Sequence, residues 1–370
     1  MRTRDDMLRN LWFAGVLVPC LPLAGQQLAA VSGEALFWFF TPIFVFVLIP
    51  LLDLAVGEYA RNPSAEAEPR LLRDRHYRRA VYLFIPAQYF ATAWIVAEIC
   101  SGTLGVAAMI GATVSIGIVN GIGINTAHEL CHGRPGLDHW LSKLALLPVA
   151  YGHFYVEHPR GHHSRVATPD DPASARLGES FYRFWPRTVF GGLASGWALE
   201  RERLRRAGSP TLTWRNNILQ TTVGTAALFA GLSLWLGPLA LLVLPAQAVV
   251  GFSLLELVNY IEHYGLLRAR LASGKREKCR PEHSWNSNAL VTNLLLYNLQ
   301  RHSDHHANAA RPYQVLRNLE GAPQLPTGYA GMVLVSLFPP LFRRLMDHRV
   351  IEHYGGDRSR AHALPGARRP

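Results

Sequence analysis

Six long apolar stretches constrain this chain more than any other feature of its sequence. An α-helix needs about 20 consecutive, mainly apolar residues to cross the hydrocarbon core of a bilayer. We predict that the following stretches are transmembrane helices: Leu11–Val31, Ala35–Val56, Ala80–Cys100, Thr103–Asn125, Ile218–Leu236 and Leu239–Tyr260. Very short links join them in pairs: Ser32–Glu34, Ser101–Gly102 and Gly237–Pro238. The expected fold class is therefore an all-α integral membrane protein.

The charge distribution sets the expected orientation. Charged residues make up 17% of the chain, whereas about a quarter is usual. The net charge of +11 suits a nucleic-acid binder or a membrane protein with basic cytoplasmic loops. The apolar stretches favour the second, so no nucleic-acid partner is expected. The three links lack Lys and Arg, whereas Gly57–Arg79 contains six arginines. By the positive-inside rule, we expect a multi-pass protein of a bacterial-type cytoplasmic (inner) membrane, with both termini cytoplasmic.

The spans and loops divide the chain into five parts. These are 1–126 with four transmembrane helices, 127–217 as a cytoplasmic or interfacial segment with two histidine boxes, 218–261 with the last two spans, 262–356 as a cytoplasmic cap with the last histidine boxes, and 357–370 as a loose basic tail. Leu141–Tyr155 is too short to span a bilayer and is expected to be a buried or re-entrant helix. Phe181–Arg206 mixes aromatic residues with arginines, which favours a helix at the headgroup level.

Nine of the sixteen histidines lie in four short clusters. They are His128 and His132 in AHELCHG, His158, His162 and His163 in EHPRGHHS, His263 in NYIEHYGLL, and His302, His305 and His306 in NLQRHSDHHA. The last three stand at i, i+3 and i+4, so on a helix they share one face and can converge on one point. Imidazole binds Zn, Cu, Fe and Ni, and nine rings exceed what one ion takes. We therefore predict a two-metal site at the cytoplasmic ends of the spans.

The other seven histidines are assigned no metal role. They are His76, His139, His153, His283, His348, His353 and His362. The four cysteines form no CxxC pair, so the chain encodes neither a zinc knuckle nor a rubredoxin-type iron site.

Two irons are the favoured cofactor for this site. A redox metal where the membrane interior meets the cytoplasm suits oxygen activation against a lipid-soluble substrate, whereas a hydrolytic zinc pair more often uses carboxylates and water. Two other classes of function stay open. One is an intramembrane zinc hydrolase with the HExxH motif of His128, Glu129 and His132. The other is a haem or metal transporter, which would need histidines within the spans.

The motifs together resemble those of one enzyme family. HELCH, EHPRGHH, NYIEHYG and LQRHSDHH, in this order on six spans, resemble the membrane-bound alkane hydroxylases, which belong to a histidine-rich di-iron group with fatty-acid desaturases and xylene monooxygenases. The strings GHHSRVATPDDPASARLGES, HSWNSN and LPTGY resemble the alkane-hydroxylase branch in particular. One departure is Cys131-His132-Gly133, where the family usually has Gly-His-Lys.

The resemblance implies a reaction, cofactors and partners. It implies terminal hydroxylation of medium- or long-chain n-alkanes to 1-alkanols, with O2 as co-substrate and two non-haem Fe as cofactor. Electrons would come from rubredoxin, here a separate chain, and its NAD(P)H-dependent reductase. The family's metal ligands fall on the nine clustered histidines. A related desaturase or a xylene-type hydroxylase is the near alternative.

Two further sets of side chains are candidates for supporting the site. Acidic residues beside the ligands can accept N–H bonds from imidazoles and fix their tautomers. The candidates are Glu129, Glu157, Glu262 and Asp304, with solvent exposure as the alternative; Glu129 and Glu262 are the favoured pair. The aromatic residues of Ala35–Val56, chiefly Trp38, Phe40 and Phe44, are candidates for the lining of a substrate channel, with lipid contact as an equal alternative.

Overall fold

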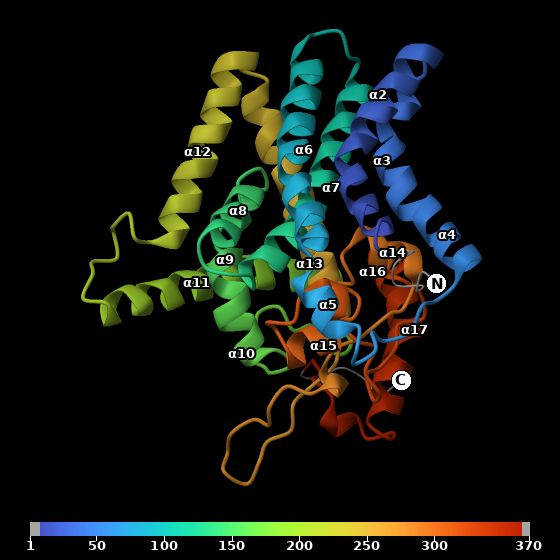
Figure 1. Ribbon diagram of the computed structural model, residues 1–370, viewed down its shortest axis with the longest axis vertical. Helices are drawn as coiled ribbons and strands as arrows, with labels where there is room; N and C mark the ends of the chain where they lie inside the picture. Colours follow the sequence, from blue (N-terminus) through green and yellow to red (C-terminus); the bar gives the residue numbers. More distant parts are fainter. Residues whose placement is uncertain (1–7, 365–370) are drawn as a thin grey trace.

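The computed structural model describes residues 8–364 and contains six helices long and apolar enough to cross a membrane (Figure 1). They are η1 and α2 (Leu11–Ser32), η2, α3, η3 and α4 (Ala35–Val56), α6 (Arg75–Cys100), α7 (Val106–Cys131), α12 (Asn217–Leu236) and α13 (Ala240–Glu262). Within residues 8–364 the β pairing is limited to four isolated bridges. The predicted fold class is confirmed, because this is an all-α, multi-pass membrane protein.

α7 lies at the centre of the bundle, and α13 packs closely against it. A methyl group at Gly121 would lie 2.6 Å from the carbonyl oxygen of Gly251, so the two backbones meet at a distance that only glycine permits. Asn120 adds a polar link inside the membrane, because its amide nitrogen donates to Gln247 Oε1 over 2.8 Å and its oxygen accepts from Gln88 Nε2 over 3.0 Å. These contacts fix α6, α7 and α13 side by side and bring their loop ends to one side of the bundle.

The long segments gather at the end of the bundle opposite the three short links (Figure 1). Their helices are α5 (Glu68–Arg73), α8 (Leu137–Leu146), α9 (Phe154–Glu157), η4 (His158–His162), α10 (His163–Arg165), α11 (Phe181–Arg206), η5 (Pro281–His283), α14 (Leu290–Leu295), α15 (His302–Ala307), η6 (Tyr313–Val315), α16 (Tyr329–Ser336), α17 (Pro339–His353) and η7 (Arg358–Arg360).

α11 has the bounds predicted for the helix at the headgroup level. It runs crosswise at the base of the spans, below α12 (Figure 1). Tyr182 and Phe190 are exposed on it, whereas Phe184 and Thr188 are buried against the rest of the protein. This amphipathic arrangement suits a helix that lies between lipid and water.

The predicted helix at residues 141–155 is instead two short ones, α8 and α9, joined by a turn. α8 ends before Pro148, whose ring removes the N–H that would continue the helix. α8 is buried against the spans, where Ser142 Oγ donates to the Ala127 carbonyl over 2.7 Å. The expectation of a buried segment is thus met by a different local structure.

The predicted loose tail also differs from the structure, as far as residue 364. The backbone N–H of His362 donates to the Gly265 carbonyl over 2.9 Å, and Leu177 forms a parallel bridge with Ala363. The His362 side chain is buried. These pairings satisfy backbone groups that a loose tail would leave to water, and they fix the chain end beside α13. Residues 365–370 lie outside the described part of the chain.

Candidate metal centre

Four elements carry the nine clustered histidines to the loop end of the bundle. The last turn of α7 carries His128, and its C-cap residue is His132. His263 caps α13 in the same way. The other two clusters lie on the segment formed by the consecutive short helices η4 and α10, and on the short helix α15. Because α7 and α13 are in close backbone contact, the histidines at their ends are held near each other.

The nine histidines form two sets of converging ring nitrogens. The first set consists of His128, His132, His158, His163 and His305, and the second of His162, His263, His302 and His306. Among the described residues, the ligand atoms of each set lie within 4.8 Å of one another. All nine predicted residues are thus brought together, and the other seven histidines stay outside both sets.

Two of the sequence clusters divide their histidines between the two sets. This differs from the expectation that His302, His305 and His306 converge on one point. His302 and His306, four residues apart on α15, belong to the second set, whereas His305 belongs to the first. Likewise His162 and His163 are neighbours in sequence but turn to different sets. The rings of consecutive residues on a helix point about 100° apart, so one cluster can serve two adjacent centres.

A wide π-type turn at η4 positions the second cluster. Gly161 lies inside this turn, and a methyl group there would come within 2.6 Å of the Arg165 Nη2 atom. A side chain at this position would displace the ends of Glu157 and Arg165, so glycine leaves room for their ion pair, which is 2.8 Å long. The turn places His158 and His163 with their Nε2 atoms 3.0 Å apart.

The distances between ring nitrogens fit bound cations. His305 Nε2 lies 2.9 Å from His128 Nε2 and 3.0 Å from His163 Nε2. A neutral imidazole has one N–H and one lone pair, so one nitrogen cannot satisfy two others of its kind. Two ligands about 2.1 Å from one ion and at right angles lie about 3.0 Å apart, so a cation at the focus resolves the clash of lone pairs.

The protonation of these rings points the same way. Burial, and next the neighbouring histidines, hold the pKa of His305 well below its ordinary value. Burial, and next His263, have the same effect on the pKa of His302. These two rings are therefore neutral lone-pair donors. The second set repeats the geometry, because His302 Nε2 lies 2.9 Å from His306 Nε2 and 3.2 Å from His263 Nε2.

Two groups that the sequence did not single out orient rings of the second set. Asp171 Oδ2 lies 3.0 Å from His162 Nδ1, which leaves His162 Nε2 for the centre. The His283 carbonyl oxygen lies 3.1 Å from His263 Nδ1 and acts likewise. Burial raises the pKa of Asp171, but His162, Ser174 and His263 together outweigh burial and lower this pKa to about 2. The motif GHHSRVATPDD contains Asp171 nine residues after His162, and this proximity was the only available signal.

The acidic residues predicted to fix tautomers have other partners. Glu129 Oε1 accepts the backbone N–H of Tyr313 over 3.2 Å, and Asp304 Oδ2 accepts that of Arg317 over 2.8 Å. Both carboxylates thus stabilise the segment that follows α15, and among the described residues neither is hydrogen-bonded to an imidazole N–H. Glu262 Oε2 lies 3.2 Å from His302 Nε2, on the inner side of that ring. It therefore faces the centre rather than the outer nitrogen that sets the tautomer.

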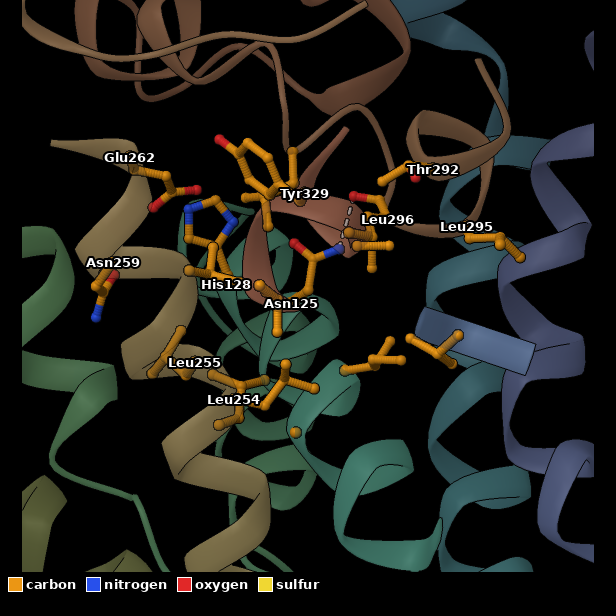
Figure 2. A pocket seen from close by; sticks show the side chains of 18 of the residues that line it. Asn125, His128, Leu254, Leu255, Asn259, Glu262, Thr292, Leu295, Leu296 and Tyr329 are labelled. Carbon is orange, nitrogen blue, oxygen red and sulfur yellow. Dashed lines mark hydrogen bonds between the residues drawn. The ribbon is translucent and has the colours of Figure 1, made fainter. Parts of the chain in front are cut away.

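A largely apolar cavity reaches both sets from within the bundle. Figure 2 shows Asn125, His128, Glu262 and Tyr329 at one end of it, with Leu254 and Leu255 along its wall. The lining residues are Val18, Val45, Phe46, Ile49, Gly121, Ile122, Ile124, Asn125, His128, Phe154, His158, Leu254, Leu255, Val258, Asn259, Glu262, Thr292, Leu295, Leu296, Leu299, His302, Tyr329, Ala330 and Val333.

The candidate channel residues Trp38, Phe40 and Phe44 are absent from this lining. The carbonyl of Trp38 accepts the Ser115 hydroxyl over 2.7 Å, and its side chain is buried in the helix packing. Phe40 and Phe44 pack on each other, with ring centroids 5.9 Å apart. Of the aromatic residues in this span, Phe46 faces the cavity. Aromatic content alone could not reveal which face of the span points inward.

Comparison with known proteins identifies the family. The model of the fatty acid desaturase family matches residues 104–336. The alkane 1-monooxygenase of Acinetobacter baylyi is 45% identical over 366 residues, covering 98% of this chain and 90% of that protein. Alkane 1-monooxygenase 1 of Alcanivorax borkumensis is 44% identical with the same coverage. The xylene/toluene monooxygenase hydroxylase component XylM of Pseudomonas putida is 28% identical over 263 residues, covering 70% and 68%. These matches confirm the resemblance, and this chain is an enzyme that belongs to the alkane 1-monooxygenase family.

Proposed function

We propose that this protein hydroxylates the terminal carbon of medium- or long-chain n-alkanes, with O2, at a centre of two irons. The observation that carries the proposal is the meeting of two all-histidine nitrogen sets with one end of a long apolar cavity. The substrate class follows the relatives that are named alkane 1-monooxygenase. An aliphatic chain matches the cavity lining, which offers few polar groups.

Five nitrogens of the first set and four of the second would hold the two irons. A bound pair of irons supplies the redox chemistry that activates O2. The zinc-hydrolase alternative fits less well, because catalytic zinc is typically held by three protein ligands and a water, whereas His128 and His132 share their set with three further rings. Glu129, the base in that alternative, is bonded to the Tyr313 backbone.

The chain's own residues would select the carbon that reacts. An alkane offers no acidic or hydrogen-bonding group, so position alone distinguishes its methyl end. Leu254, Leu255 and Leu296 line the cavity near the histidines, and Val45 and Phe46 line it from the second span. An alkane that enters with its methyl group first would present that group to the centre, while the apolar wall excludes water from the rest of the chain.

The electron donor is proposed to be rubredoxin, which binds on the loop side. A cleft there is lined by five arginines: Arg268, Arg270, Arg276, Arg280 and Arg360. Part of the cleft belongs to the loop that extends from the foot of the molecule in Figure 1. In this loop the backbones of Arg270 and Arg276 form an antiparallel bridge. His283 lines the same cleft, and its carbonyl contacts His263 of the second set. An acidic carrier would dock here with complementary charge.

The proposed location is the bacterial inner membrane, with the loop side and both termini in the cytoplasm. Support comes from the arginines of the loop side, which the positive-inside rule places in the cytoplasm. A reductase that uses NAD(P)H would also be found there.

Purification followed by metal analysis and product analysis tests the proposal. The enzyme, supplied with rubredoxin, its reductase, NADH and a series of n-alkanes, should form 1-alkanols and contain about two irons per chain. A terminal alkene as the product would favour the desaturase alternative. A zinc-containing protein that hydrolyses peptides or esters without O2 would refute the proposal.

A further inference from the structure

A second, smaller cavity lies beside the metal centre and is separate in character from the apolar one. It lies between the α9–η4 segment, α11 and α13, and it touches His158 of the first set and His162 of the second. His158 and Asn259 line both cavities. The smaller cavity also contains Tyr151, His153, Thr188 and Glu256. One side of the centre therefore faces a cavity lined mainly by apolar side chains, and the other faces polar, titratable side chains.

Glu256 is the central group of this polar cavity. It lies within the membrane helix α13 and is buried. Its carboxylate accepts hydrogen bonds from Tyr151 Oη over 2.7 Å, Thr188 Oγ1 over 2.8 Å and Asn259 Nδ2 over 3.1 Å. An ionisable side chain inside a membrane is costly and marks a functional position, often a proton relay. The two hydroxyls can both donate and accept, so they can pass a proton on.

On the side of α11, the cavity is bounded by a partly exposed glycine. Gly192 of α11 lines the cavity and presents no side chain over it. The nearest heavy atom to a methyl group placed there would be His153 Nε2, 3.7 Å away. The ring of His153 in turn lies 4.2 Å from that of Tyr151, whose hydroxyl donates to Glu256. His153, Tyr151 and Glu256 are thus in successive contact within a cavity that also touches His158 and His162.

The proposed reaction needs such a path. It consumes an alkane, O2, two electrons and two protons; one oxygen atom forms the C–O bond of the 1-alkanol, and the other leaves as water. All four rings of the second set are buried, whereas His132 and His163 of the first are partly exposed, so protons reach the second set through the protein. Besides its histidines, the apolar cavity is lined by two titratable side chains, Glu262 and Tyr329, at the end beside the centre. Resting on the proposed function, we propose that the polar cavity is the proton entry route, with Glu256 as its relay and Gly192 as its mouth.

Replacement of the relay is the first test. Glu256→Gln keeps the size of the side chain but cannot take up and release a proton. We expect at least a tenfold loss of 1-alkanol formation, a normal iron content and an unchanged Tm, together with a larger solvent deuterium isotope effect than that of the wild type. Glu98→Gln, which changes another carboxylate in a span away from both cavities, should alter none of these.

Closing the mouth is an independent test on a surface helix. Gly192→Leu should lower turnover several-fold with a raised solvent isotope effect. It should also reduce hydroxyl-radical labelling of Tyr151 in the metal-free protein, because less water reaches the cavity. Gly231→Leu is the matched control, because a methyl group there meets no atom within 4 Å.

The outcomes separate this proposal from the proposed function. If the wild type forms 1-alkanols while Glu256→Gln and Gly192→Leu both keep wild-type turnover, isotope effect and labelling, the proton route is refuted and the proposed function stands. Loss of iron or of folding in Glu256→Gln with a fully active Gly192→Leu would show a structural role and also overturn the proposal. A wild type without 1-alkanol formation would refute the proposed function itself.

Discussion

The two histidine sets differ in how their rings are held. In the described residues, none of the five rings of the first set is hydrogen-bonded to a carboxylate, and four of these rings form a row of direct Nε2 contacts in the order His128, His305, His163 and His158. The second set depends on outside partners, namely Asp171 on His162 and the His283 carbonyl on His263. We infer that the positions of the helices alone hold the rings of the first set in place. Metal binding by the second set, in contrast, can be weakened by changing residues outside the set.

Removal of a ring should have the largest effect and should be similar in both sets. For His305→Ala in the first set and His302→Ala in the second, we expect a fall in 1-alkanol formation of at least about 100-fold. Each variant should retain about one iron per chain, because the other set is complete. Elemental analysis with product analysis checks this.

Exposed histidines offer the control for these two variants. His348 lies outside both sets and its side chain bonds to the Arg344 carbonyl on the surface of α17. His348→Ala should retain full activity and metal content. An active His302→Ala variant that has lost only zinc would instead support the hydrolase alternative built on His128, Glu129 and His132.

Asp171→Asn should reveal the difference between the sets. Loss of the carboxylate that orients a ligating imidazole typically weakens metal binding about 10–100-fold. We expect this loss for one of the two irons, the one in the second set, while the other keeps its affinity. Chelator competition followed by iron analysis would detect two classes of iron in the variant.

The neighbouring residue supplies the matched comparison. Asp170→Asn removes the same charge from the same loop, but Asp170 is exposed and Asp171 is buried. Asp170→Asn should bind both irons as the wild type does. Equal weakening of both irons in Asp171→Asn would mean that the two sets depend on each other, contrary to the comparison above.

The comparison also explains which parts of the site the sequence could predict. Six spans and nine clustered histidines follow from composition and spacing, because bilayer thickness and helix periodicity act locally along the chain. The assignment of His305 to one set and His302 to the other depends on where α7 and α13 end in space. Such long-range packing leaves no trace in the spacing of one cluster.

Partners outside the histidine clusters were equally hidden. The His283 carbonyl is a backbone group that any residue type could supply, and Asp171 lies in a loop rich in turn residues. Glu129 and Asp304 stand next to ligands in sequence. Each nevertheless accepts a backbone hydrogen bond from the segment that follows α15. Nearness to a ligand in the sequence was therefore a poor guide to which residues hold the ligand rings in place in the fold.

The apolar cavity allows a smaller, selective change. Phe46 lines the cavity from the second span, whereas Phe40 does not. Phe46→Ala should enlarge the cavity and raise the preference for longer alkanes several-fold, since each buried methylene contributes about 0.8 kcal/mol. Competition between two alkane chain lengths would measure it. Phe40→Ala should leave the preference unchanged, and a shift in both variants would argue for a channel through the whole second span.

The smallest expected effect concerns the path of electrons toward the second set. Arg270 is exposed at the arginine cleft whose wall includes His283. Arg270→Glu should raise the KM for rubredoxin about fivefold at low ionic strength and leave kcat at saturating carrier unchanged, because a surface charge acts mainly on encounter. The difference should fade as salt screens the charges. Arg201→Glu, an equal change on exposed α11, should have no such effect. If both variants respond alike, the basic surface as a whole attracts the carrier, and the cleft beside His283 is not its docking site.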